Sequence, residues 1–241
     1  MPSPAVTVAS LRAELRAHAT PERALVSQRF FKTGKGEYGE GDVFLGVAVP
    51  DIRRAVRAHR ALPLAAAETL LSSKLHEERL AAVLLLVDQF GRAKRDPAAQ
   101  EAIYALYLRR LDRVNNWDLV DSSAPHIVGA WLRGRDRGVL EELARSPRLW
   151  TRRVAMLATQ HFIREGEAED ALRIAALLVD DEEDLMHKAV GWMLREVGES
   201  VGLAALRGFL AAHAGAMPRT MLRSAIEKLS PAERRRWMDA G

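Results

Sequence analysis

The stretch HKAVGWMLREVG, from His187 to Gly198, decides the fold class because its apolar residues recur at helical spacing. The residues at positions i, i+3, i+4 and i+7 of this stripe are Val190, Met193, Leu194 and Val197. At about 100° per residue, Trp192 points away from the stripe and shares its face with Lys188 and Arg195. The stretch therefore predicts an amphipathic helix with a tryptophan and two cations outside its core face.

The same helical spacing continues through nearly the whole chain, and the alternation typical of strands is almost absent. Ala, Leu, Arg and Glu, which are strong helix formers, dominate the composition. We expect helices at 7–18, 21–32, 50–60, 63–73, 76–90, 98–111, 116–133, 137–144, 147–163, 167–178, 183–196, 200–213, 217–228 and 231–238. The sequence therefore predicts an all-α protein.

Helix-opening segments of similar sequence recur along the chain. They are ERLAAVLL at 78, RRVAML at 152, HKAVGWML at 187 and LRSAI at 222. The markers Arg79, Trp117, Arg153, Lys188 and Arg223 follow one another in steps of 38, 36, 35 and 35 residues. This period fits a two-helix unit, and stacked units of this kind leave a curved inner surface for a large ligand. We expect one domain over 1–241, an α-solenoid of HEAT-like repeats.

The segment GKGEYG, from Gly34 to Gly39, fits the dinucleotide-binding pattern G-x-G-x-x-G. That pattern requires a strand before the glycines, whereas a helical segment precedes them here. Nearby acidic residues that would repel a pyrophosphate are Glu37, Glu40 and Asp42. The residues at about 33–46 are instead expected to form an inserted glycine-hinged loop or short hairpin. Within it, Lys35 and Tyr38 are candidate contacts to a partner; the alternative is a simple exposed connection.

The composition excludes several classes of protein. Cysteine is absent, so disulfides and thiolate chemistry are excluded, and a cytoplasmic location is the simplest expectation. No apolar run approaches the length of a membrane span. The net charge is +4 and arginine greatly outnumbers lysine. Arginine suits phosphate, so a basic face would indicate a nucleic-acid partner if the arginines lie together.

The segment NNWDLVDSSAPHIVGAW contains a candidate site. Asn116 is a suitable N-cap, and Trp117 and Asp121 are i, i+4 neighbours on one flank of the helix that follows. Pro125 should kink this helix. Asp121 has no capping role, so a salt bridge and a catalytic role are both open for it.

The segment LWTRRVAMLATQHF is expected to direct Arg152 to solvent and to place Arg153 at the edge of the apolar stripe. The apolar stripes place three ring side chains in the core: Trp131, Trp150 and His161. The histidines are scattered without H-x-x-x-H or H-E-x-x-H spacing, so no metal site and no cofactor are expected.

Five segments together resemble the AlkD-like DNA alkylation-repair family. In chain order they are FLGVAVPDIRR, NNWDLVD, LWTRRVA, HKAVGWMLREVG and MPRTMLRSAIEKL. They extend over about residues 29 to 229, and the WD-x-V-D and K-A-x-G-W-x-L-R-E elements are the most specific. The resemblance implies a HEAT-like solenoid whose basic concave face holds double-stranded DNA, with no membrane and no obligate protein partner.

The resemblance also implies an activity, the excision of N3- and N7-alkylated purines by hydrolysis of the N-glycosidic bond. Carried over by motif, the catalytic aspartate falls on Asp121, the two sugar-contacting tryptophans on Trp117 and Trp192, and the pocket arginine on Arg153. We assign DNA contacts to the remaining marked side chains: Lys188, Arg195, Arg152, Arg79, Arg223, Lys35 and Tyr38.

The inserted TGKGEYGEGD segment departs from the glycosylase-type members of this family. It resembles a branch with a hairpin at this place, some members of which bind branched DNA without excising bases. The first hypothesis is therefore a monofunctional alkylpurine DNA glycosylase, and the alternative is a non-catalytic binder of branched or damaged DNA. A protein-interaction scaffold is a third hypothesis, which would require an apolar groove in place of a basic one.

Overall fold

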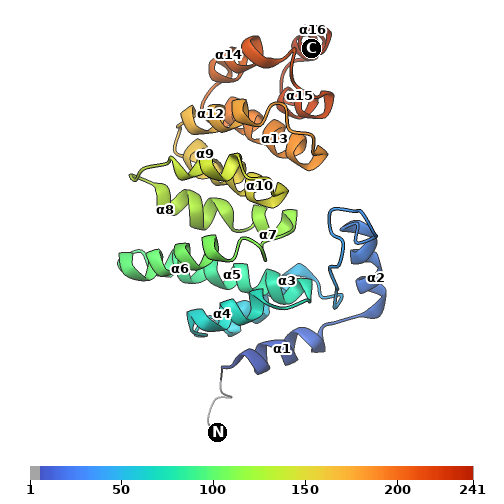
Figure 1. Ribbon diagram of the computed structural model, residues 1–241, viewed down its shortest axis with the longest axis vertical. Coiled ribbons are helices and arrows are strands. Elements are labelled where there is room, and N and C mark those ends of the chain that lie inside the picture. The colour runs from blue at the N-terminus through green and yellow to red at the C-terminus, as the bar shows by residue number, and fades with distance from the viewer. Residues whose placement is uncertain (1–5, 241) are drawn as a thin grey trace. The chain divides into compact units, whose positions relative to one another are not determined.

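A computed structural model of the protein describes residues 6–240, and these residues form helices and connecting turns without a strand (Figure 1). The predicted all-α class is confirmed. The helices divide into two compact units, an N-terminal unit that ends at Ser123 and a C-terminal unit that begins at Ala124. Within the described residues, no helix combines the length and apolarity that crossing a membrane requires.

The N-terminal unit is built around one apolar helix. Its helices are α1 (Val8–Ala17), α2 (Pro21–Phe30), α3 (Val49–Ala58), α4 (Leu64–Leu71), α5 (His76–Arg92), α6 (Pro97–Arg109) and α7 (Trp117–Asp121). Every residue from His76 to Leu86 in α5 is buried. Helices α1, α3, α4, α6 and α7 all pack against α5. In contrast, α2 buries none of its residues.

The C-terminal unit contains the helical segments η1 (Pro125–Gly129), α8 (Ala130–Leu132), α9 (Val139–Ala144), α10 (Leu149–Ala158), α11 (Gln160–Arg164), α12 (Glu169–Leu177), α13 (Asp184–Ser200), α14 (Leu203–His213), α15 (Arg219–Ala225) and α16 (Pro231–Ala240). Helix α10 packs against α13, and α13 packs against α15. Helices α9, α12 and α14 precede these three along the chain and pack beside them. Three of the repeat markers, Arg153, Lys188 and Arg223, are each the fifth residue of α10, α13 and α15.

The helix expected over 116–133 is interrupted. Helix α7 ends at Asp121, and the chain resumes as a π-helical segment from Pro125 to Gly129. Proline cannot donate the backbone hydrogen bond of a regular helix, and the regular α-helix is interrupted around Pro125.

The apolar stripe of the opening stretch is fully buried, as expected, at Val190, Met193, Leu194 and Val197. The assignment of three ring side chains to the core is corrected: Trp131, Trp150 and His161 are each half-buried. Each lies near a helix end, where fewer neighbouring residues can cover a large ring. The Arg135 guanidinium, 3.8 Å from the Trp131 ring centroid, covers one ring face instead.

Gly191 in α13 makes the close approach of α13 and α15 possible. A Cβ atom at this position would lie 2.5 Å from the Met221 carbonyl oxygen and 2.5 Å from Ser224 Cβ. Because one of these atoms belongs to the backbone of α15, the clash cannot be relieved by a change of rotamer. We expect Gly191→Ala to lower the free energy of unfolding by about 1–3 kcal/mol, measured by denaturant titration.

Gly208→Ala in α14 is the matched control. A Cβ atom at Gly208 meets no atom within 4 Å, so this change should stabilise the protein by about 0.5–1 kcal/mol through helix propensity. Equal stability of the two variants would contradict the packing role of Gly191.

Candidate functional site

The site is built on α7, the five-residue helix that carries Trp117 and Asp121. The expected N-cap is confirmed, because Asn116 Oδ1 accepts a hydrogen bond of 2.9 Å from the Trp117 backbone N–H. Asp118 lies in the first turn, where a carboxylate interacts favourably with the helix dipole. Trp117 and Asp121 are both half-buried.

A buried histidine connects α7 to α5. His76 Nε2 lies 2.7 Å from Asp118 Oδ2, and His76 Nδ1 lies 3.0 Å from Asp42 Oδ2. Only an imidazolium can donate from both ring nitrogens to two carboxylates. Burial acts to lower the pKa of His76, but the hydrogen bonds and charges of Asp118 and Asp42 outweigh it and raise the pKa to about 9. His76 is therefore charged at neutral pH.

Asp42, from the inserted segment, is the second anchor of this network. It accepts hydrogen bonds from three side chains: from His76, from Arg79 Nη2 at 2.5 Å and from Asn116 Nδ2 at 3.1 Å. Burial opposes ionisation, but His76 and Arg79 together hold the pKa of Asp42 below its ordinary value. With Asp118 included, two cations face two carboxylates, so the buried cluster is neutral.

The structure corrects the expectation that Arg79 contacts DNA. Its side chain is fully buried, and its guanidinium also donates to the carbonyl oxygens of Ser73 and Lys74. Helical periodicity assigns no role to His76, and the sequence predicts only charge repulsion for Asp42. The one feature of the sequence that could have indicated this buried cluster is the charged run HEER, directly before the apolar residues of α5.

The inserted segment between α2 and α3 is a series of turns and contains no hairpin. Its one β-bridge joins Val43 to Leu75. The Glu77 carboxylate accepts hydrogen bonds of 2.8–3.2 Å from three successive backbone N–H groups, those of Leu45, Gly46 and Val47. The segment is therefore fastened to the start of α5 by Glu77 and by the Asp42 cluster.

This arrangement places aromatic rings against Trp117. The Phe31 ring stacks on Trp117 with centroids 5.2 Å apart and planes 15° apart. Phe30 meets Trp117 edge-on at 5.8 Å while remaining 63% exposed. Phe44 stacks on both Phe31 and His76. One face of Trp117 is thus occupied by Phe31, and any ligand stacked on Trp117 must use the other face.

A tyrosine of α6 stabilises the turn that follows α7. The Ser123 hydroxyl donates to the Leu119 carbonyl oxygen at 2.5 Å, so the Tyr107 hydroxyl, 2.8 Å away, donates to Ser123. Burial, and to a lesser degree the charge of Asp121, raises the pKa of Tyr107, although the hydrogen bond to Ser123 opposes the shift. Tyr107 therefore stays neutral beside the Asp121 carboxylate.

The C-terminal unit carries the second candidate tryptophan on α13. Trp192 is half-buried, and its Nε1–H donates to Glu196 Oε1 at 2.8 Å. Lys188 pairs with Asp184 at 2.6 Å, and Arg195 pairs with Glu227. The two cations beside Trp192 are therefore balanced by carboxylates.

The two arginines of α10 differ from their expected placement. Arg152 was expected to point to solvent, but it is half-buried because it pairs with Asp181 at 2.6 Å and donates to two backbone carbonyls. Arg153 is buried, and its Nη1 donates to the Leu185 carbonyl oxygen at 2.6 Å. Both guanidinium groups thus link α10 to residues just before or at the start of α13.

Other candidate contacts lie nearer the surface. Lys35 and Arg223 are exposed, and the half-buried Tyr38 donates from its hydroxyl to the Phe30 carbonyl oxygen at 3.2 Å. In the part of the chain that the structure describes, no three His, Asp or Glu side chains form a metal-binding group.

The buried cluster predicts a pH dependence of stability. The folded-state pKa of His76, about 9, exceeds the ordinary value of 6.5. Protonation of His76 thus stabilises the fold fully below about pH 6.5, and this contribution is lost as the pH rises through about 9. We expect His76→Gln to lower the free energy of unfolding relative to wild type, and to lower it by roughly 2–3 kcal/mol more near pH 6.5 than near pH 9. Urea titrations of both proteins at the two pH values measure this difference.

His18→Gln, at an exposed histidine in the same unit, is the control and should follow the wild-type pH profile. Parallel pH profiles of wild type and His76→Gln would show that His76 is not the group that titrates.

Comparison with known proteins identifies the family of this sequence. The sequence matches the DNA alkylation repair enzyme family over residues 11–229. A comparison with curated proteins gives no match.

Two solved structures have similar folds. One is a protein from Enterococcus faecalis described as a predicted DNA alkylation repair enzyme, with a TM-score of 0.67 and 17% identity over 89% of this chain and 98% of that chain. The other is AlkD2 from Streptococcus mutans, with a TM-score of 0.53 and 18% identity over 92% of this chain and 97% of that chain. At these identities the structures support the fold alone. The family match spans most of the sequence, and the protein therefore belongs to the DNA alkylation repair enzyme family.

Proposed function

We propose that this protein is a DNA glycosylase that removes cationic N3- or N7-alkylated purines from double-stranded DNA, with Asp121 as the catalytic carboxylate. Family membership supports DNA alkylation repair as the process. The observation that carries the catalytic assignment is the position of Asp121. It is a half-buried carboxylate one turn after Trp117, on a helix held at both ends by buried hydrogen bonds.

The chemistry needs little besides a carboxylate. An alkylated purine already bears a positive charge, so its N-glycosidic bond breaks without protonation of the leaving base. Positive charge then develops on the deoxyribose, where the Asp121 carboxylate would stabilise it. Water adds to the anomeric carbon, the base leaves neutral, and the proton from water passes to Asp121 and then to solvent.

The aromatic side chains would assist by cation–π attraction to the sugar cation. In the N-terminal unit, Trp117 would use the face opposite Phe31. In the C-terminal unit, the half-buried Trp192 would contact DNA, and the buried Arg153 would hold α10 against the start of α13. Glu196, which accepts a hydrogen bond from Trp192, would fix the orientation of the indole ring.

Base release from duplex DNA that contains N7-methylguanine tests the proposal. Asp121→Asn preserves the shape of the side chain but removes its charge. We expect a loss of about 10²-fold or more in the single-turnover rate of base release at matched DNA occupancy, with binding unchanged.

Asp112→Asn, which neutralises an exposed carboxylate of the same unit, is the matched control and should retain the wild-type rate. Trp192→Ala, assayed in parallel, tests the contribution of the C-terminal unit. If the wild type binds this DNA without releasing base, the glycosylase proposal is wrong and a binding function is favoured.

A non-catalytic binder of branched DNA is the second candidate function. One observation favours it: the exposed Phe30, at the end of α2, lies edge-on to Trp117, and the inserted segment that follows carries the exposed Lys35. An exposed aromatic ring can stack on an unpaired base at a junction.

A double variant, Phe30→Ala with Lys35→Gln, tests this second function and leaves Asp42 in place. If junction binding is the function, the preference for a four-way junction over duplex DNA should fall roughly tenfold in a competition assay, and Asp121→Asn should leave it unchanged. If the protein is a glycosylase, the wild type should show no preference for a four-way junction over duplex DNA.

A further inference from the structure

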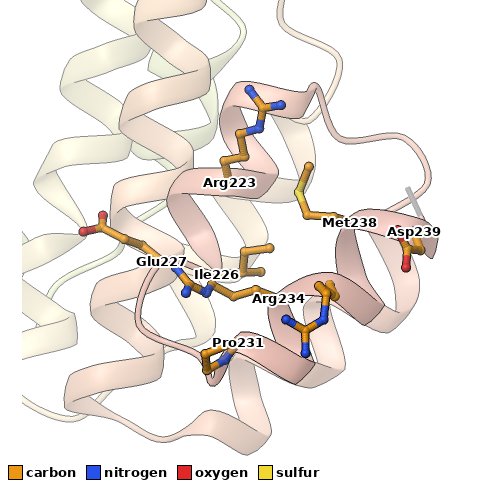
Figure 2. Close-up of a pocket in the computed structure, with 8 residues that line it drawn as sticks. Arg223, Ile226, Glu227, Pro231, Arg234, Met238 and Asp239 are labelled. Carbon is orange, nitrogen blue, oxygen red and sulfur yellow. The ribbon is translucent and has the colours of Figure 1, made fainter.

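A pocket of about 400 Å³ lies between α15 and α16 at the end of the C-terminal unit (Figure 2). Helix α16 begins at Pro231, after the family match ends at residue 229. The pocket is therefore formed by the last helix of the family region and one helix beyond it. It lies outside the site proposed for catalysis.

The pocket combines cationic and apolar side chains. Its cations are Arg223 from α15 and Arg234 and Arg235 from α16. Ile226, Pro231 and Met238 supply its apolar lining.

The three arginines differ from two neighbouring arginines of this unit, Arg195 and Arg207. Among residues 6–240, their guanidinium groups have no ion pair or hydrogen bond, whereas Arg207 pairs with Glu233 and Arg195 with Glu227. Two carboxylates, those of Glu227 and Asp239, also line the pocket. Glu227 forms an ion pair with Arg195, so Asp239 is the carboxylate that remains to balance the pocket arginines. Three unpaired cations therefore face one remaining carboxylate, and the pocket favours an anion.

The position of Arg223 indicates what kind of anion. As the fifth residue of α15, it occupies the place that Arg153 has in α10 and Lys188 has in α13. Arg153 is buried, but Lys188 is exposed like Arg223, and α13 packs against α15. The pocket therefore lies beside a second exposed basic position, which pairs with Asp184 at the surface. Exposed basic residues on two successive packed helices match a polymer of phosphates better than a single small anion.

We propose that the pocket between α15 and α16 binds the sugar–phosphate backbone of DNA, with Arg234 and Arg235 on phosphates and the apolar residues against deoxyribose. The guanidinium fork suits bidentate contact with a phosphodiester. Helix α16 thereby extends the DNA-binding surface of the C-terminal unit beyond the family region. This inference depends on the proposed function only in taking DNA as the partner.

The test is equilibrium binding of a short undamaged duplex over a range of salt concentrations, with wild type compared with Arg234→Gln/Arg235→Gln. Each phosphate contact contributes about 0.9 to the slope of log affinity against log salt concentration. We expect the double variant to reduce the magnitude of this slope by about 2 and to weaken binding roughly tenfold or more at low salt. Both arginines are exposed, so the variant should keep the wild-type melting temperature.

Arg236→Gln is the matched control. It removes one positive charge from the same helix, half of what the double variant removes. Arg236 lies near the Trp237 ring, 5.7 Å from its centroid, and does not line the pocket. Arg236→Gln should leave the slope close to that of wild type. Arg234→Lys/Arg235→Lys should keep most of the slope but bind more weakly, because lysine retains the charge without the fork.

Three outcomes would overturn the proposal. Equal slopes for Arg234→Gln/Arg235→Gln and Arg236→Gln would show that the pocket makes no phosphate contact. Saturable binding of inorganic phosphate that is lost in the double variant, with an unchanged DNA slope, would assign the pocket to a free anion. Absence of duplex binding by wild type would overturn this inference and the proposed function together, whereas DNA binding without base release would overturn the glycosylase activity alone.

Discussion

The start of α5 is the constraint on which the N-terminal unit depends. Four consecutive ionisable residues, from His76 to Arg79, are buried there, and each binds a residue of another segment of the unit. Glu77 binds the backbone of the inserted segment and Glu78 binds Arg12 of α1. His76 and Arg79 bind Asp42, and His76 also binds Asp118 of α7. Because burial of an unpaired charge is costly, loss of one partner would disturb the packing of several elements together.

The same cluster determines the surroundings of the candidate site. Asp42 ties the inserted segment to the N-cap of α7, and this brings Phe31 onto one face of Trp117. The segment is therefore part of the site's framework, although its glycines and exposed lysine are typical of a simple connection. The hydrogen bonds that Asp42 and His76 make here are buried and involve charged groups, and such bonds fix orientation more strictly than apolar contacts do.

Helical periodicity was sufficient to predict the all-α class, the buried stripe of α13 and the break at Pro125, because these features depend on local geometry. The Asn116 cap was predictable for the same reason. The Asp42–His76–Asp118 cluster was not predictable, since it joins residues 34 and 42 positions apart that share no local pattern. Arg79 and Arg152 show the same difficulty: helical spacing gives the face of a residue, but the carboxylates that bury or bind it come from distant segments.

The position of Asp121 is unusual for a protein whose ligand is a polyanion. In α10, α13 and α15 the fifth residue is basic, whereas the fifth residue of α7 is Asp121. A carboxylate at this position does not attract phosphate, so DNA binding alone gives no reason for it. A negative charge becomes useful where positive charge develops during a reaction, as it does on deoxyribose when a cationic base leaves. A residue whose charge is opposite to that of its counterparts in the other helices is expected at a functional site, and this supports the catalytic role proposed for Asp121.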